Sequence, residues 1–238
     1  MTKPIRRTSI AEATMNHIVE RIRMGDFGPG DRLPSERDMQ EQLGVGRLAL
    51  REALARLSAL GIIRVDHGKG AFIQKRPSSA SVAGALIPCF PERDVKSMED
   101  LIKARALIES ELAALAAERR TEEDIALLSG ILDEAGQAMD HNSTLAELDY
   151  KFHLEIARIA DNDFLAVMLK ALGSHIRRFL HYYVEALGNP RLAIKRHKPI
   201  LQAIIDKNPQ LARELARAHV GIALANVEAF MEDQAKRA

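Results

Sequence analysis

Several residue types and patterns are scarce or missing in this chain of 238 residues. Tryptophan is absent, and cysteine occurs once, at Cys89, so neither an intrachain disulfide nor a Cys-x-x-Cys metal motif can form. No run approaches the roughly 20 apolar residues of a membrane-spanning helix, and the amino end lacks the apolar core of a signal peptide. These absences exclude proteins stabilised by intrachain disulfides and proteins that span a membrane. We expect a cytoplasmic protein without a membrane partner.

The composition that is present favours helices and two domains. Hydrophobic residues make up 47% of the chain and charged residues 28%, with alanine and leucine abundant. The net charge of +1 is uneven, because residues 1–76 hold 14 Lys and Arg against 9 Asp and Glu, and the remainder holds 20 against 24. Unless this difference arose by chance, the basic amino-terminal part predicts contact with a polyanion.

Residues 1–76 predict a small domain of three helices followed by a β-hairpin. Apolar spacing and turn residues favour helices over 10–24, 35–43 and 46–59. Two short β-rich runs follow at 62–65 and 71–74, joined by His67-Gly68-Lys69-Gly70. This order of elements is typical of a winged helix-turn-helix domain, whose third helix enters the major groove of DNA.

The candidate DNA-binding residues are basic or lie in the wing. Arg47 and Arg51 lie one turn apart at the outward start of the third helix, where arginine can pair with guanine or clamp phosphate. Arg37, on the preceding helix, is expected to contact the sugar-phosphate backbone of the DNA and so to position the domain. In the wing, glycines allow a close approach to DNA, and the neighbouring side chains can donate hydrogen bonds to phosphate or to the minor groove. The wing residues are His67, Gly68, Lys69 and Gly70. The alternative is that these are ordinary solvated charges.

Residues 25–73 resemble the winged-helix domain of the GntR family of bacterial transcription regulators. The resemblance rests on Leu33 through Arg37, Val45 through Arg47, Arg51 through Leu54 and the wing glycines. It implies that Arg37, Arg47, Arg51 and residues 67–70 contact the operator. The chain departs from the common pattern at Gly46, where a serine usually stands, and at Leu48-Ala49, where Thr-Pro is frequent, which leaves the operator sequence open.

Beyond a linker at residues 77–96, the chain predicts an all-α antiparallel bundle over residues 97–238. Six helices are expected, at about 97–118, 121–140, 143–160, 163–187, 190–206 and 208–235. Ser97, Thr121 and Asn208 are the expected caps. The connections between these helices are short, so neighbouring helices are expected to run antiparallel.

An acid and three histidines interrupt the apolar stripes of three of these helices. Asp149 and His153 lie one turn apart on the face marked by Leu148 and Phe152, and His197 and His219 replace apolar residues on two later helices. A carboxylate and neutral imidazoles that converge are the ligands of Zn, and also of Ni, Co, Mn or Fe. Any one histidine alone more often fills a core position, but a set of four unpaired polar groups is costly to bury. We therefore predict a divalent metal site.

Arg105 and Glu109 lie one turn apart on the inward face of the first bundle helix. An internal ion pair and a ligand-binding role explain them equally well. In the second case, Arg105 offers a fixed fork to a carboxylate near the metal.

Residues 97–222 resemble the FCD effector domain of the FadR-type branch of GntR regulators. The pattern includes Arg105 with Glu109, Asp149 with Phe152-His153, Asn162, His197 and His219. The resemblance implies metal binding through Asp149, His153, His197 and His219, and an effector site that includes Arg105 and Asn162. It also implies a small organic-acid or sugar-acid effector and a homodimer that reads a palindromic double-stranded operator.

The sequence thus predicts a transcription regulator, a repressor of a catabolic operon that leaves its operator when a small carboxylate binds near the metal. One alternative is a regulator in which the ion itself is the signal. Another is a metal-dependent hydrolase, which the absence of a His-Glu-x-x-His motif disfavours. We do not expect an enzyme.

Overall fold

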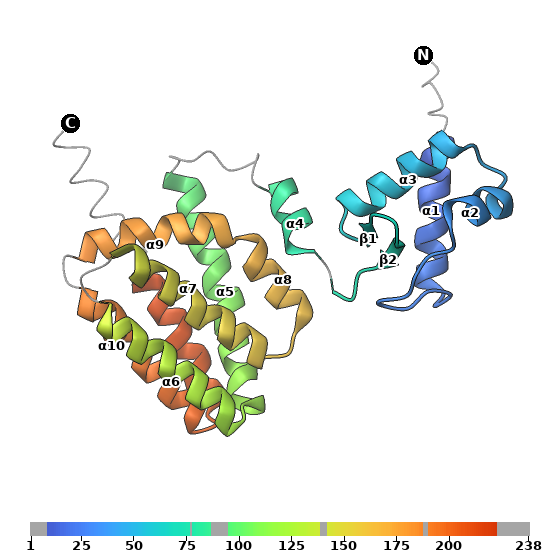
Figure 1. Ribbon diagram of the computed structural model, residues 1–238. Helices are drawn as coiled ribbons and strands as arrows, with labels where there is room; N and C mark the ends of the chain where they lie inside the picture. The colour runs from blue at the N-terminus through green and yellow to red at the C-terminus, as the bar shows by residue number, and fades with distance from the viewer. Residues whose placement is uncertain (1–8, 77, 87–94, 139–141, 188–189, 223–238) are drawn as a thin grey trace, which may run out of the picture. The chain divides into compact units, whose positions relative to one another are not determined.

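The structure is a computed structural model that describes residues 9–76, 78–86, 95–138, 142–187 and 190–222 (Figure 1). The chain divides into two compact units, residues 1–82 and 83–238. Each unit has its own cluster of buried apolar side chains. Within the described residues, no helix combines the length and the apolar character needed to cross a bilayer.

Three helices of the first unit pack around buried leucines. They are α1 (Ile10–Arg23), α2 (Glu36–Leu43) and α3 (Arg47–Ala59). Ser35 caps α2 by accepting a hydrogen bond from the Asp38 amide, and Gly44 ends this helix in the left-handed conformation. On α3, Leu50, Leu54 and Leu57 face the core, as their spacing predicts.

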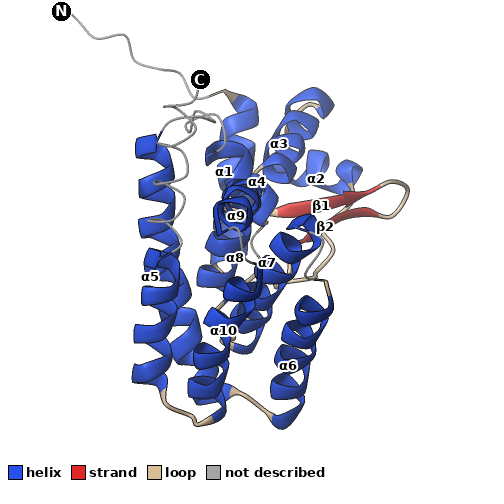
Figure 2. Cartoon of the chain, turned by 90° about the vertical axis from the view of Figure 1, so that its left-hand side faces the viewer, coloured by secondary structure: helices blue, strands red, loops and turns tan. Residues whose placement is uncertain are grey.

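The wing is an antiparallel pair of strands, β1 (Ile63–Asp66) and β2 (Gly70–Ile73), drawn in red in Figure 2. The predicted hairpin is present with its ends displaced by one residue, so that Gly70 belongs to β2 and pairs with Asp66. The segment before α2 also joins the wing, because Leu33 donates to the Ala71 carbonyl at 2.8 Å. This extra pairing, centred on a bridge between Arg32 and Phe72, anchors β2 on its second edge.

Part of the segment predicted to be a linker, residues 77–96, is helical. Helix α4 (Ser79–Leu86) consists of serine, alanine, valine, glycine and leucine, and no proline lies inside it. Its start lies close to Gly61, since a Cβ at Gly61 would overlap Ser78 and Ser81. The prolines of this segment lie in the sequence before and after the helix. Residues 77 and 87–94 of the predicted linker lie outside the described residues.

The second unit is a bundle of helices that lie alongside one another (Figure 1). The central helix is α7, which packs against all the other labelled bundle helices. Their bounds are α5 (Val95–Arg119), α6 (Glu122–Gln137), α7 (Asn142–Ile159), α8 (Asp163–Ala171), α9 (Gly173–Leu187) and α10 (Pro190–Ile205). A last helix is described over 209–222, and the rest of its predicted length, 223–235, lies outside the described residues. The predicted all-α bundle is confirmed.

Small side chains and caps determine how these helices meet and end. Four alanines of α5, at 113, 114, 116 and 117, are at most 1% exposed and leave room for neighbouring helices. Thr121 and Asp124 form the predicted capping box at the start of α6, and Asn208 caps the last helix. Ser97 is not a cap, because α5 begins earlier, at Val95.

The single helix predicted over 163–187 is instead two helices, α8 and α9. Helix α8 ends at Ala171 with Leu172 as its C-cap, and α9 begins at Gly173. Gly173 lies against α7, where a Cβ would overlap the Tyr150 hydroxyl. Apolar periodicity continues through this point, so the sequence pattern did not show the break.

We predict that Gly173→Ala destabilises the bundle by about 1–3 kcal/mol, because the added methyl group must displace the buried Tyr150 ring. Urea unfolding of the full chain measures the change. Gly130→Ala is the matched control, since its Cβ would meet nothing within 4 Å inside α6. That variant should be neutral or stabilised by roughly 0.5–1 kcal/mol. Equal stability of the two variants would contradict the close approach at Gly173.

Candidate metal centre and nucleic-acid interface

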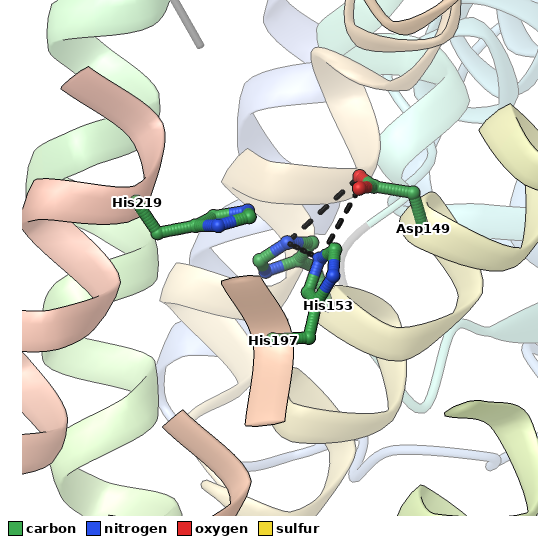
Figure 3. A group of neighbouring side chains, drawn as sticks. All are labelled: Asp149, His153, His197 and His219. Carbon is green, nitrogen blue, oxygen red and sulfur yellow. Dashed lines mark hydrogen bonds and ion pairs between the residues drawn. The ribbon is translucent and has the colours of Figure 1, made fainter. Parts of the chain in front are cut away.

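The four predicted metal ligands meet in the interior of the bundle. Asp149 and His153 come from α7, His197 from α10 and His219 from the last helix. One ligand atom of each residue lies within 4.8 Å of the others, and all four residues are buried. Figure 3 shows the imidazole rings turned toward one another with the Asp149 carboxylate beside them. The convergence predicted from helical periodicity is therefore present.

The contacts within the cluster are short and involve the same few atoms. His197 Nε2 lies 3.1 Å from Asp149 Oδ1 and 3.3 Å from His153 Nε2. His153 Nε2 lies 3.9 Å from Asp149 Oδ2. The rings of His197 and His219 are 4.4 Å apart between centroids. Lone-pair atoms from three helices thus face one small volume.

Several polar atoms of the cluster lack a hydrogen bond despite full burial. Both oxygens of Asp149 and Nδ1 of His219 are in this state. Leaving such atoms unpaired costs about 1–3 kcal/mol each, and more for a charged group. Phe152 packs edge-on against His153 and His197 and covers that side of the cluster with an apolar ring. These buried polar atoms therefore have no hydrogen-bond partner among the described residues.

A second buried pair lies beside the cluster on α5. Arg105 Nε donates to Glu109 Oε1 at 2.7 Å, and the two side chains are each 2% exposed. Glu109 Oε2 lies 3.0 Å from His153 Nδ1, and Arg105 Nη1 has no hydrogen-bond partner. The predicted ion pair is present, and one guanidinium nitrogen stays available for another anion.

Burial and neighbouring charges shift the pKa values of several groups in and beside the cluster. Burial lowers the pKa of His153, although Glu109 and Asp149 oppose the shift. Burial, followed by His197 and His153, lowers the pKa of His219 well below its ordinary value. Burial acts to raise the pKa of Asp149, but His197, His153 and His219 together outweigh it and the pKa falls. Burial likewise acts to lower the pKa of Arg105, and Glu109 reverses that shift.

The donor set fits a divalent metal ion. Three imidazoles and one carboxylate are a common ligand combination for Zn²⁺ and related ions, and the unpaired oxygens of Asp149 are suitable donors. Arg105, Glu109 and Asp149 carry one positive and two negative charges. With neutral imidazoles, this buried group therefore has one uncompensated negative charge, which a cation would balance.

Asn162 has a structural role that the resemblance did not indicate. It is the N-cap of α8, and its Oδ1 accepts a hydrogen bond from the Leu165 amide at 3.2 Å. Arg119 of α5 donates to the nearby carbonyls of Ala160 and Asp161. This cap and this arginine hold the turn between α7 and α8.

The predicted DNA-binding residues lie on the surface of the first unit. Arg37, Arg47 and Arg51 are exposed, and so are His67, Gly68 and Lys69 in the turn between the strands. Arg37 lies 3.1 Å from Glu41, and Arg51 lies 3.5 Å from Glu36. Gly46 precedes α3 without a side-chain cap, which agrees with the loss of the usual serine.

One basic residue near the wing was missed by the sequence analysis. The guanidinium of Arg32 lies against Gly70, where a Cβ would be 3.0 Å from Arg32 Nε. Gly70 has a φ of +109°, which favours glycine. The bridge between Arg32 and Phe72 is nonlocal, and no local pattern at Arg32 indicated it.

Both units match known protein families. Residues 10–73 match the family described as bacterial regulatory proteins, gntR family, and residues 100–221 match the FCD domain. The HTH-type transcriptional repressor NanR of Klebsiella aerogenes is 31% identical over 224 residues, which cover 92% of this chain and 85% of that protein. The chain belongs to the GntR family.

Other GntR regulators support this assignment. The HTH-type transcriptional repressor NanR of Escherichia coli K12 is 29% identical over 243 residues, covering 99% of this chain and 91% of that protein. Streptococcus agalactiae GntR superposes with a TM-score of 0.62 at 26% identity, covering 90% of this chain and 99% of that one. Escherichia coli McbR/YncC shares the fold, with a TM-score of 0.53, 24% identity and coverage of 94% and 100%.

These findings confirm three predictions made from the sequence. The family is GntR with an FCD domain, and the fold is a winged helix-turn-helix followed by an all-α bundle. The relatives are transcriptional repressors, so the chain is a regulator and not an enzyme.

We predict that the full chain binds one divalent ion at the His–Asp cluster and that this ion stabilises it. At a free metal concentration 100 times the dissociation constant, the gain is about 2.7 kcal/mol. Thermal unfolding and elemental analysis, with and without a chelator, measure the effect. His219→Ala should abolish it, whereas His181→Ala, an exposed histidine on α9, should retain it. Identical metal content in the two variants would contradict the assignment.

Proposed function

We propose that this chain is a repressor that binds a palindromic operator as a homodimer and leaves it when a small carboxylate binds in the FCD domain. The observation that carries the proposal is the buried His–Asp cluster beside Arg105, a cation that retains an unpaired nitrogen. The regulated genes are expected to form a catabolic operon. The cytoplasm is the expected location.

The DNA-binding part of the proposal rests on the exposed face of the winged domain. Arg47 and Arg51 lie one turn apart in the first half of α3, the helix that enters the major groove in this fold. Arg37 lies in the first turn of α2, where a phosphate contact would orient the domain. Lys69 and His67 extend from the turn of the wing toward solvent.

The effector part rests on the charges of the buried group. Adding a divalent cation to Arg105, Glu109 and Asp149 turns one excess negative charge into one excess positive charge. A carboxylate effector would balance that charge, with Arg105 Nη1 as a hydrogen-bond donor. When bound, the metal supplies Lewis-acid attraction for a carboxylate oxygen. Zinc is the expected ion, and Ni, Mn, Co and Fe share its ligand preferences.

Release from DNA requires that the effector prefer one arrangement of the dimer. Two winged domains must match the spacing of two half-sites, so any change in their separation weakens binding. An effector that binds the DNA-incompetent arrangement more tightly lowers operator affinity by its differential binding energy, typically about 1–3 kcal/mol. The cluster joins α7, α10 and the last helix, so binding there acts on helices far apart in the sequence.

We predict that replacing Arg47 and Arg51 together by alanine abolishes specific operator binding without unfolding the protein. Each lost bidentate base contact costs about 1–3 kcal/mol, or roughly 10- to 100-fold in affinity. The probe is a duplex selected from a random library by the unmodified protein, and its affinity is measured by fluorescence anisotropy.

The matched control for this pair is Arg56→Ala, an exposed arginine in the last turn of α3 that pairs with Glu52. This variant should bind the selected duplex within about twofold of the unmodified protein, the small change expected away from the recognition surface. Retained specific binding by the double variant would overturn the assigned recognition helix.

We predict that at least one organic or sugar acid raises the melting temperature of the metal-loaded protein and releases the selected duplex. Chelation, or Arg105→Met, should abolish both effects. Release by added metal alone, with no acid required, would instead show that the ion is the signal. A panel of acids that neither stabilises the loaded protein nor affects DNA binding would contradict the effector proposal.

A further inference from the structure

Glu109 is a buried carboxylate that lies between the guanidinium of Arg105 and a predicted metal ligand. Its Oε1 accepts the Arg105 Nε–H at 2.7 Å, while its Oε2 lies 3.0 Å from His153 Nδ1. Glu109 is 3% exposed and Arg105 1% exposed, so water cannot replace either contact. The three residues form a continuous chain of polar groups from α5 to α7.

The position of Glu109 determines which nitrogen of His153 can face the cluster. Only a protonated Nδ1 can donate to Glu109 Oε2, and in a neutral imidazole this leaves Nε2 with its lone pair. Nε2 is the atom that lies 3.9 Å from Asp149 Oδ2 and 3.3 Å from His197 Nε2. The carboxylate and the cluster therefore lie on opposite edges of the same ring.

We propose that Glu109 is a positioning residue that holds His153 in the Nδ1–H tautomer and ties it to Arg105. This inference rests on the proposed metal site. A carboxylate hydrogen-bonded to a ligating histidine orients the ring and raises its basicity. Because the same carboxylate also holds Arg105, an anion that binds Arg105 changes the contacts of a metal ligand.

A purely structural ion pair would not need this arrangement. Arg105 already uses Oε1 of Glu109, whereas the buried Oε2 makes no aligned hydrogen bond with any described residue. His153 Nδ1, on α7, lies 3.0 Å from this oxygen, close enough for a hydrogen bond after a small rotation of either side chain. The second oxygen is thus directed at the cluster.

The test compares Glu109→Gln with Glu111→Gln in the full chain. Glu111 lies on the same helix, is exposed and pairs with Arg213 at 2.8 Å, so its replacement also removes a carboxylate from an ion pair. Zinc affinity is measured by competition with a chromophoric chelator, and the Co²⁺-loaded forms are compared by visible absorption. We expect Glu109→Gln to bind zinc about 10- to 100-fold more weakly with altered cobalt bands. Glu111→Gln should match the unmodified protein.

A second measurement avoids any variant of Glu109 and so does not depend on its folding. In the unmodified chain without metal, ¹H–¹⁵N correlation spectra of the imidazoles report the tautomer of His153, whose signals are assigned with His153→Asn. We expect the proton on Nδ1. A proton on Nε2, or equal zinc affinity for Glu109→Gln and the unmodified protein, would overturn this inference alone. Absence of zinc binding by the unmodified protein would instead overturn the proposed function.

Discussion

The organisation of the bundle depends on burying a charged cluster that the protein does not neutralise by itself. Asp149 is buried with both oxygens lacking an aligned hydrogen bond, and its nearest polar neighbours are His197, at 3.1 Å, and His153, at 3.9 Å. An unpaired charge in an apolar interior costs several kcal/mol. In the proposed function, a divalent cation would remove that cost and join three helices at one point. The same ion would supply the positive charge that balances a carboxylate effector.

Much of this site could be predicted from the sequence, because its residues break a regular pattern. An acid at 149 and a histidine at 153 stand one turn apart on a stripe marked by Phe152, and helical geometry places their side chains together. His197 and His219 interrupt two further stripes in the same way. Burial of all four residues follows from the stripes alone. That the three helices converge could only be inferred, since periodicity gives the face of a helix but not its neighbour.

The features that the sequence did not indicate depend on contacts between distant segments. Gly173, at the break between α8 and α9, lies against Tyr150 on another helix, and the extra pairing of Arg32 with Phe72 joins residues 40 positions apart. Helix α4 was hidden by the prolines around it. The role of Glu109 could not be chosen from spacing, because an i, i+4 pair with Arg105 fits an ion pair without any third partner. The contact of Glu109 with His153, 3.0 Å long, is visible only in the structure and supports the proposed positioning role.

The measurement that tests the account most directly is X-ray absorption at the metal edge of the full-length protein. Loaded with zinc, the protein should give a first shell of three imidazole nitrogens and at least one oxygen at about 2.0–2.2 Å. Multiple scattering from the imidazole rings should report three histidines, and His219→Ala should reduce that number to two. A shell of oxygen alone, or a spectrum unchanged by His219→Ala, would contradict a metal centre built from Asp149, His153, His197 and His219.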